Sequence, residues 1–272
     1  MKLKNKKFII TSLTIIALLA ITVIQIGKNS GNQEETRLTS SQGLSNKKIG
    51  WGIKRNDNHE QPDLGKVNKE ILEKNNGIAM GNNNDKYIYL TFDEGYEAGH
   101  TTQILSTLKE NNVKATFFIT AHYLNTQPDL VKQMIEEGHI VGNHTVNHKS
   151  MPSLTEEQIN SEVMDLHKTI YEKFGYEMKY IRPPMGEFSE KSITVTNSLG
   201  YKTVMWSFAY EDWNENKQPE ESTAKKKIID NVHNGEIMLL HGNSTTNTNI
   251  LGDIIKEIRN MGYEFKSLDE FK

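Results

Sequence analysis

KYIYLTFDEGY, residues 86–96, is the stretch on which the fold depends. The residues YIYLTF, just before Asp93, are all β-formers, so they predict a buried strand. Asp93, Glu94 and Gly95 follow directly and put two carboxylates where the backbone turns. Asp and Gly also favour ordinary turns, so this ending alone does not establish a site.

Strand and helix patterns alternate from this stretch to the C-terminus. Strands are predicted at residues 113–120, 139–141, 179–182, 202–208, 236–241 and 263–266, and helices at 101–111, 129–137, from 154, and at 189–199, 220–233 and 250–261. Repeated β-then-α units indicate a parallel sheet with right-handed crossovers. Neither a G-x-G-x-x-G motif after the first strand nor a Walker loop is present, which argues against nucleotide binding.

Composition indicates a globular protein with an unusual N-terminus. Charged residues are 25% and hydrophobic residues 36% of the 272 residues, and the absence of cysteine excludes disulfides and thiolate chemistry. Residues 1–30 hold five of the 32 basic residues and no acidic one. The remaining 27 basic and 35 acidic residues give a net charge of −8, which argues against nucleic acid as a partner.

The uncharged run Phe8–Ile26 predicts a membrane anchor. Its 19 residues are long enough to span a bilayer, and four lysines precede it. Such lysines keep the N-terminus inside, so we expect residues 1–7 in the cytoplasm and the rest of the chain outside. The alternative is a cleaved secretion signal, although the run lacks a small-x-small cleavage site after it.

Two segments separate this anchor from the first strand. Residues 27–48 are polar and lack apolar periodicity, so they predict a flexible linker. Residues 49–85 predict an N-terminal extension that packs on the main domain and contains a short helix at 66–74. Residues 86–272 then form the main domain.

Polar side chains follow five of the predicted strands at their C-terminal ends. They are Asp93 and Glu94; His144 and His148; Arg182; Asp212 and Trp213; and His241. In a parallel α/β barrel these ends share one face, where active sites form. Individually each has a structural explanation: Arg182 could form a salt bridge, Asp212 could cap a helix, and His241 could be a core histidine.

His144 and His148 have a spacing that allows both to bind one metal ion. Two surface histidines also occur at this spacing by chance. Imidazole ligands favour zinc-like metals over magnesium or calcium, which prefer oxygen.

Five motifs of this sequence resemble, in order and spacing, the five motifs of the polysaccharide deacetylase family (NodB-like domain). They are TFDEG, HTVNH, RPPMG, DW and LLH. The segment WGIKRNDNHEQPDLGK, residues 51–66, resembles the subgroup of delta-lactam-biosynthetic, or muramic acid, de-N-acetylases of spore formers. The resemblance implies a distorted (β/α)7 barrel that follows the N-terminal extension.

The resemblance also implies roles. Asp93 corresponds to the general base, His241 to the proton donor for the leaving amine, and Asp212 to the partner that orients His241. Arg182 resembles the arginine that orients an active-site carboxylate, without indicating which one. The substrate would contact Trp213 and the backbone at Pro184 and Met185, where an N–H group could bind an oxyanion.

A divalent metal, expected to be zinc, would be held by His144 and His148. Glu94 stands where the family usually has a metal-binding Asp and the muramic acid subgroup often has Asn. Its side chain is one methylene longer than that of Asp. As a third ligand, Glu94 would therefore need a changed rotamer or a turn shifted at Gly95.

We expect a membrane-anchored, extracellular hydrolase that removes N-acetyl groups from N-acetylmuramic acid in peptidoglycan, for muramic delta-lactam formation in the cell wall or spore cortex. Its partners would be peptidoglycan glycan strands and the membrane, with no nucleic acid or nucleotide. Two alternatives remain open: a chitooligosaccharide or ester deacetylase on the same scaffold, and a catalytically weakened wall-binding module.

Overall fold

The computed structural model describes residues 43–271. The predicted cytoplasmic segment, the anchor and most of the linker lie outside them. The chain divides into two compact units, Met1–Leu44 and Ser45–Lys272, and the second contains all the elements below. Among residues 43–271, no helix is both long and apolar enough to cross a membrane.

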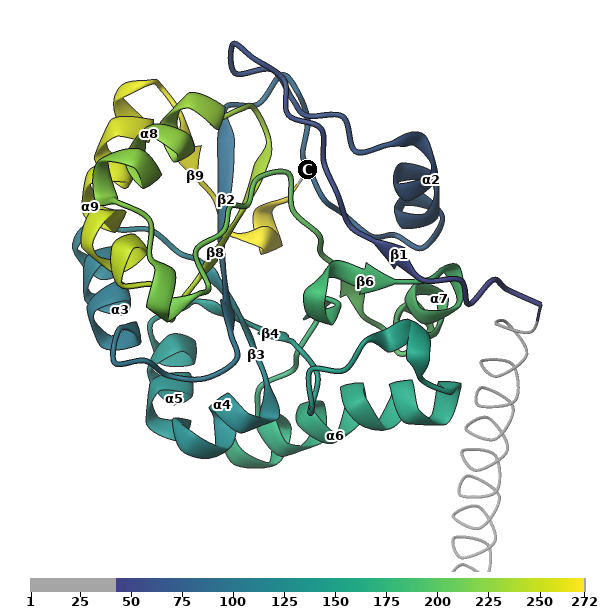
Figure 1. Ribbon diagram of the computed structural model, residues 1–272. Helices are drawn as coiled ribbons and strands as arrows, with labels where there is room; N and C mark the ends of the chain where they lie inside the picture. The colour runs from purple at the N-terminus through teal and green to yellow at the C-terminus, as the bar shows by residue number, and fades with distance from the viewer. Residues whose placement is uncertain (1–42, 272) are drawn as a thin grey trace, which may run out of the picture. The chain divides into compact units, whose positions relative to one another are not determined.

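A curled parallel sheet of seven strands forms the centre of the second unit (Figure 1). In sheet order the strands are β7 (Lys202–Thr203), β5 (Tyr180–Ile181), β4 (Ile140–Asn143), β3 (Thr116–Ile119), β2 (Tyr87–Glu94) and β8 (Glu236–His241), with β9 (Glu264–Phe265) paired to the start of β2. The predicted α/β class with a parallel sheet is confirmed.

The predicted strand at residues 202–208 is regular only over β7. Beyond it, Val204 N–H still donates to the Ile181 carbonyl of β5 at 2.8 Å. Phe208 instead forms a parallel bridge with Met238 of β8. This irregular segment therefore links the two edges of the curled sheet.

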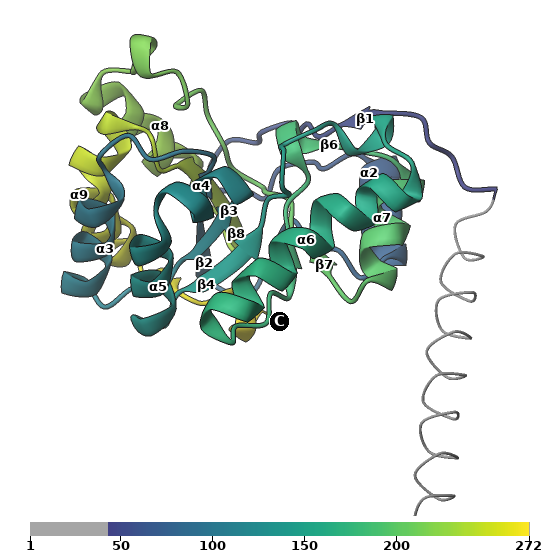
Figure 2. The ribbon, with the colours of Figure 1, turned by 90° about the horizontal axis from the view of Figure 1, so that it is seen from below.

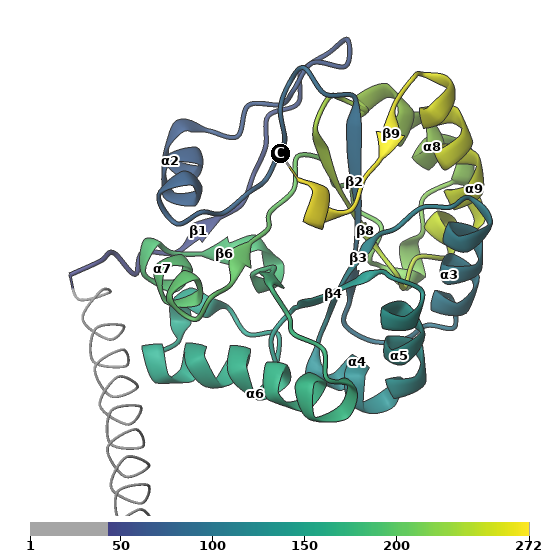
Figure 3. The same ribbon diagram turned by 180° about the vertical axis from the view of Figure 1, so that it is seen from behind.

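Helices surround the sheet on its outer side (Figures 1 and 3). They are α3 (Thr101–Glu110), α4 (Ala121–Thr126), α5 (Pro128–Glu136), α6 (Glu156–Phe174), α7 (Glu190–Ser198), α8 (Glu221–Asn231) and α9 (Thr245–Asn260), with 3-10 turns at Met151–Ser153, Pro184–Gly186, Glu215–Lys217 and Leu268–Glu270. Thr155 caps α6 as the N-cap of a capping box. Helix α4 was not predicted, and α9 begins at Thr245 instead of residue 250.

Strand alternation sorts the side chains of β2 between two hydrophobic clusters. Ile88, Leu90 and Phe92 pack with helix residues in the main core, outside the sheet. Tyr89 belongs to a separate cluster inside the curl, with side chains from β3, β4, β5 and β8. Because successive side chains of a strand point to opposite faces, Asp93 points inward.

The N-terminal extension packs against β6 (Glu187–Phe188) and α7 (Figure 2). Its strand β1 (Ile49–Gly50) pairs antiparallel with β6, and its helix α2 covers Lys66–Lys74, as predicted. Trp51 Nε1 donates to the Trp206 carbonyl at 2.9 Å. The Ser45 carbonyl accepts from Lys191 N–H at 3.1 Å, so the last residues of the predicted linker already contact the domain.

Candidate active site

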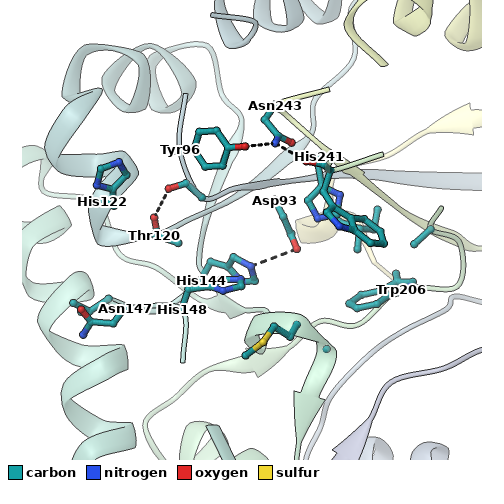
Figure 4. Close-up of a pocket in the computed structure, with 17 residues that line it drawn as sticks. Asp93, Tyr96, Thr120, His122, His144, Asn147, His148, Trp206, His241 and Asn243 are labelled. Atoms are coloured by element: carbon teal, nitrogen blue, oxygen red, sulfur yellow. Dashed lines mark hydrogen bonds and ion pairs between the residues drawn. The ribbon is translucent and has the colours of Figure 1, made fainter. Parts of the chain in front are cut away.

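The carboxyl ends of the strands surround a pocket of about 1050 Å³ (Figure 4). The predicted site residues that line it are Asp93, His144, His148, Met185, Trp213 and His241. Arg182, Asp212 and Pro184 are instead buried behind its wall. The structure thus brings together polar groups that come from separate strands and lie far apart in the sequence.

Asp93 forms a buried ion pair with Arg182. Asp93 Oδ1 lies 2.7 Å from Arg182 Nη1, which identifies Asp93 as the carboxylate that this arginine contacts. The guanidinium has no exposed surface, donates from Nε to the Val204 carbonyl at 3.2 Å and lies 4.2 Å from the centre of the Phe118 ring. Arg182 therefore holds the Asp93 side chain in one position.

The charges around Asp93 decide its protonation state. Burial acts to raise the pKa of Asp93, but Arg182, His144 and His241 act in the opposite direction and leave the pKa below its usual value. Asp93 is therefore a carboxylate at neutral pH, as a proton acceptor must be.

His144 follows β4 directly and faces Asp93. Its Nδ1 lies 2.8 Å from the Arg182 carbonyl oxygen. A carbonyl can only accept, so Nδ1 carries the hydrogen and Nε2 presents its lone pair to the pocket, 3.5 Å from Asp93 Oδ2. Burial lowers the pKa of His144 to about 4, so the ring is neutral at pH 7.

His148 lies beside His144 in the loop after β4. The two rings are arranged edge to face, with centroids 4.8 Å apart. His148 and Thr145 both have left-handed backbone angles, with φ of 53° and 71°. Burial also lowers the pKa of His148, although Asp93 opposes the shift. The pair thus offers two neutral imidazoles to the pocket.

Glu162 of α6, which was not identified from the sequence, holds this histidine loop in place. Its carboxylate is 5% exposed and accepts from Asn147 N–H at 2.7 Å and from Asn147 Nδ2 at 2.8 Å. Its backbone carbonyl accepts from Val146 N–H at 3.0 Å. These hydrogen bonds fix the residues between the two histidines and offset the strain of the left-handed positions.

The expectation that Glu94 completes the histidine site does not agree with the structure. Glu94 points outward because it alternates with Asp93, and it does not line the pocket. A Cβ atom on Gly242 would come within 2.0 Å of Glu94 Oε1, so the carboxyl group fills the space beside that glycine. Burial, then Glu97 and Asp93, raise the pKa of Glu94 well above its usual value.

The donor chemistry of the histidine pair fits a zinc-like metal. Both imidazoles are neutral, and the hydrogen bond at His144 Nδ1 leaves Nε2 free to ligate. Within residues 43–271, however, no three His, Cys, Asp or Glu side chains gather as a metal site. A metal bound here would take its other ligands from water or substrate.

His241, the last residue of β8, forms a pair with Asp212. Its Nδ1 donates to Asp212 Oδ1 at 2.7 Å, and its backbone N–H donates to Asp212 Oδ2 at 2.9 Å. Burial acts to lower the pKa of His241, but Asp212 outweighs it and leaves the pKa raised. His241 is also the register neighbour of Asp93, so an acid and a base face the pocket from adjacent strands.

Exposed side chains form the rim of the pocket. Trp213 is 52% exposed, and its ring centroid lies 5.6 Å from that of His241. Tyr96, also half-exposed, was not identified from the sequence. Asn243 Nδ2 donates to Tyr96 Oη at 2.7 Å and to the Trp213 carbonyl at 2.9 Å, so it joins two loops of the rim. Met185, 56% exposed, has a left-handed φ of 58°.

The pocket combines a carboxylate base, two imidazoles and a histidine that is hydrogen-bonded to a carboxylate. This combination is typical of an enzyme that hydrolyses acyl groups. The model of the polysaccharide deacetylase family matches residues 80–204. Peptidoglycan-N-acetylmuramic acid deacetylase PdaA of Bacillus subtilis is 42% identical over 231 residues, 85% of this chain and 88% of the relative. The chain therefore belongs to the polysaccharide deacetylase family.

Solved structures agree with this assignment. The structure of Bacillus subtilis PdaA, a family 4 carbohydrate esterase, superposes with a TM-score of 0.81 over 84% of this chain and 98% of that chain. A family 4 carbohydrate esterase from Bacillus anthracis is 40% identical, with a TM-score of 0.72 over 84% of this chain and 98% of that chain. A peptidoglycan-N-acetylglucosamine deacetylase of Bacillus cereus is 34% identical over 69% of this chain and 89% of the relative.

Calorimetric titration with Zn²⁺ tests the histidine pair. We expect His144→Ala to lower the affinity by about tenfold or more, because it removes one of two imidazole ligands. His122→Ala, which removes another histidine of the pocket, should leave the affinity unchanged. Glu94→Gln should also change it by less than about twofold, since this side chain points away. Equal affinity in the wild type and His144→Ala would exclude the metal site, and a large loss in Glu94→Gln would restore Glu94 as a ligand.

Proposed function

We propose that this protein removes the N-acetyl group from N-acetylmuramic acid residues of peptidoglycan. The observation that carries the proposal is the position of Asp93, which contacts Arg182 and His144 and neighbours the His241–Asp212 pair across the sheet. The similarity to the muramic acid deacetylase of Bacillus subtilis supports the choice of sugar. The matched structures support a distorted (β/α)7 barrel as the scaffold.

Asp93 acts as the general base. Its carboxylate takes a proton from a water molecule as the water oxygen attacks the acetyl carbonyl carbon. Arg182 keeps Asp93 ionised and prevents its side chain from turning away.

His241 acts as the general acid. When the C–N bond breaks, the imidazolium gives its Nε2 proton to the leaving amine, and acetate is released. Asp212 favours this charged form and fixes which ring nitrogen faces the pocket, because it accepts the hydrogen bond from Nδ1.

The pocket wall holds the acetyl group. Met185 lies at the rim just after Pro184, and its backbone N–H is the proposed donor to the oxyanion. Trp213 stands beside His241 and provides an apolar surface for the substrate. His144 and His148 would hold a divalent metal, proposed to be zinc, which when bound would supply polarisation of the carbonyl and of the attacking water.

The pH profile of deacetylation follows from these roles. Asp93 must be ionised, so kcat/KM should fall on the acid side only as the pH drops through the pKa of Asp93, which Arg182 and the nearby histidines hold below its usual value. His241 must be protonated, so kcat/KM should also fall as the pH rises through the pKa of His241, which Asp212 raises above its usual value. Asp212→Asn should move this alkaline limb to lower pH, because it removes the charge that stabilises the imidazolium.

Substitution of Asp93, the proposed general base, tests its role in the same assay. Asp93→Asn should lower kcat by about 100-fold or more, since it removes the base and keeps the shape. Asp253→Asn, on the exposed side of α9, should leave acetate release unchanged. Near-normal turnover by Asp93→Asn, or an unshifted alkaline limb in Asp212→Asn, would show that these roles are wrong.

Substrate preference separates the proposed function from its alternatives. We expect acetate release from wall glycan stripped of its peptides to exceed release from chitooligosaccharide by about tenfold or more. Mass spectrometry of the digested glycan should place the free amine on muramic acid. Free amine on glucosamine, or a preference for chitooligosaccharide or acetylxylan, would favour the other deacetylases, and no release from any glycan would favour a wall-binding module.

Localisation is a further part of the proposal. We propose that the uncharged run Phe8–Ile26, which lies outside the described residues, anchors the protein with its active site outside the membrane, where peptidoglycan lies. The full-length protein should sediment with membranes, and deletion of residues 1–30 should release it. Soluble wild-type protein in the medium that begins near residue 30 would instead indicate cleaved secretion.

A further inference from the structure

The stretch Asn243–Asn247 begins two residues after His241 and has no role in the mechanism above. It was not predicted as helix, but its last residues form the first turn of α9. Three of its side chains contact the loop that carries Asp212 and Trp213: Asn243, Ser244 and Asn247. Figure 4 shows Asn243 between Tyr96 and the region of His241.

Asn247 contacts the carboxylate of Asp212 itself. Asn247 Nδ2 donates to Asp212 Oδ2 at 2.6 Å, and both residues are 1% exposed. The other two donors to this carboxylate are the ring and the backbone N–H of His241. Among the described residues, Asn247 is thus the one side chain besides His241 that fixes the rotation of the Asp212 carboxylate.

Tyr210 fixes the orientation of the Asn247 amide. Its hydroxyl donates to Asn247 Oδ1, which leaves the amide nitrogen facing Asp212. Burial raises the pKa of Tyr210, so the hydroxyl keeps its hydrogen throughout the working pH range. Asn247 N–H in turn donates to Ser244 Oγ, the N-cap of α9, at 3.1 Å. Hydrogen bonds therefore fix both the side chain and the backbone of Asn247.

We propose that Asn247 is a positioning residue for the deacetylation: it orients the Asp212 carboxylate so that Asp212 in turn aims the proton-donating nitrogen of His241 at the substrate. The inference rests on the proposed function, because the aim of His241 matters only if this histidine protonates a leaving group. Without Asn247 the carboxylate keeps only its two hydrogen bonds from His241 itself, so no partner outside His241 fixes the angle at which Asp212 holds the ring.

Steady-state kinetics on peptide-stripped wall glycan test the inference. Asn247→Ala should lower kcat by about tenfold and change KM by less than about twofold, since Asn247 does not touch substrate. The matched control is Asn249→Ala, on the same helix, because Asn249 Nδ2 donates to the carboxylate of Glu221 at 2.7 Å, outside the site. Tyr210→Phe, which removes only the hydroxyl, should give a smaller loss in kcat, and it provides a second variant if Asn247→Ala does not fold.

A double-mutant cycle distinguishes positioning from general structural support. In an Asp212→Asn background, Asn247→Ala should lower the residual kcat by less than about twofold, because its target is already gone. Equal losses with and without the Asp212 carboxylate would overturn the inference.

Nuclear magnetic resonance of the His241 ring provides a measurement that needs no substrate. Asp212, Asp93, Arg182 and His148 all interact with this ring, and Asn247→Ala leaves the other three unchanged. The pKa of His241 should fall in Asn247→Ala and stay at the wild-type value in Asn249→Ala. An unchanged pKa in Asn247→Ala would overturn the inference. A wild type that deacetylates no glycan would instead refute the proposed function, and the ring titration would still decide whether Asn247 positions the pair.

Discussion

The buried ion pair between Arg182 and Asp93 is the interaction on which the rest of the site depends. A guanidinium without exposed surface needs a charged partner, and breaking such a pair typically costs about 3–5 kcal/mol. The same arginine orients His144 through its backbone carbonyl. Its guanidinium also packs on Phe118, whose ring occupies the space that a side chain at Gly142 would need: a Cβ there would lie 2.5 Å from Phe118 Cδ1.

Strand alternation then sorts two adjacent acids into different roles. Asp93 lies on the inward face of β2, as Tyr89 does. Glu94 lies on the outward face, as Ile88, Leu90 and Phe92 do. Position at the end of a strand predicts that both carboxylates lie near the site, but only the alternation tells which one enters it. The Glu94 carboxyl group lies beside Gly242 and does not line the pocket, so it is turned away from the histidine pair that would hold a metal.

The bounds of some elements could be predicted from the sequence almost to the residue, as α2 at Lys66–Lys74 and the apolar strand β8 at Glu236–His241 show. The start of α9 could not, because its first turn, TTNTN, is polar and the apolar period begins at Ile250. Contacts such as Glu162 with Asn147 and Asn247 with Asp212 join residues 15 and 35 positions apart. No local pattern encodes such pairs, since the fold alone brings them together.

A second group of buried polar residues shows why residue type alone does not define a site. His233 Nε2 lies 2.8 Å from Ser207 Oγ, and Glu236 Oε2 lies 3.4 Å from His233 Nδ1, an order of groups that resembles serine hydrolases. The hydrogen on Nδ1, however, is donated to the Asn231 carbonyl at 2.8 Å and not to Glu236. Burial raises the pKa of Glu236 well above its usual value, which favours a neutral acid that cannot stabilise an imidazolium. The adjoining cavity measures about 10 Å³, too small for a substrate, and Glu236 begins β8, whereas His241 ends it. The His241 pair differs in that its partner Asp212 is a charged carboxylate, that it faces the open pocket and that it lies at the carboxyl end of β8. It is therefore the pair that is equipped for chemistry.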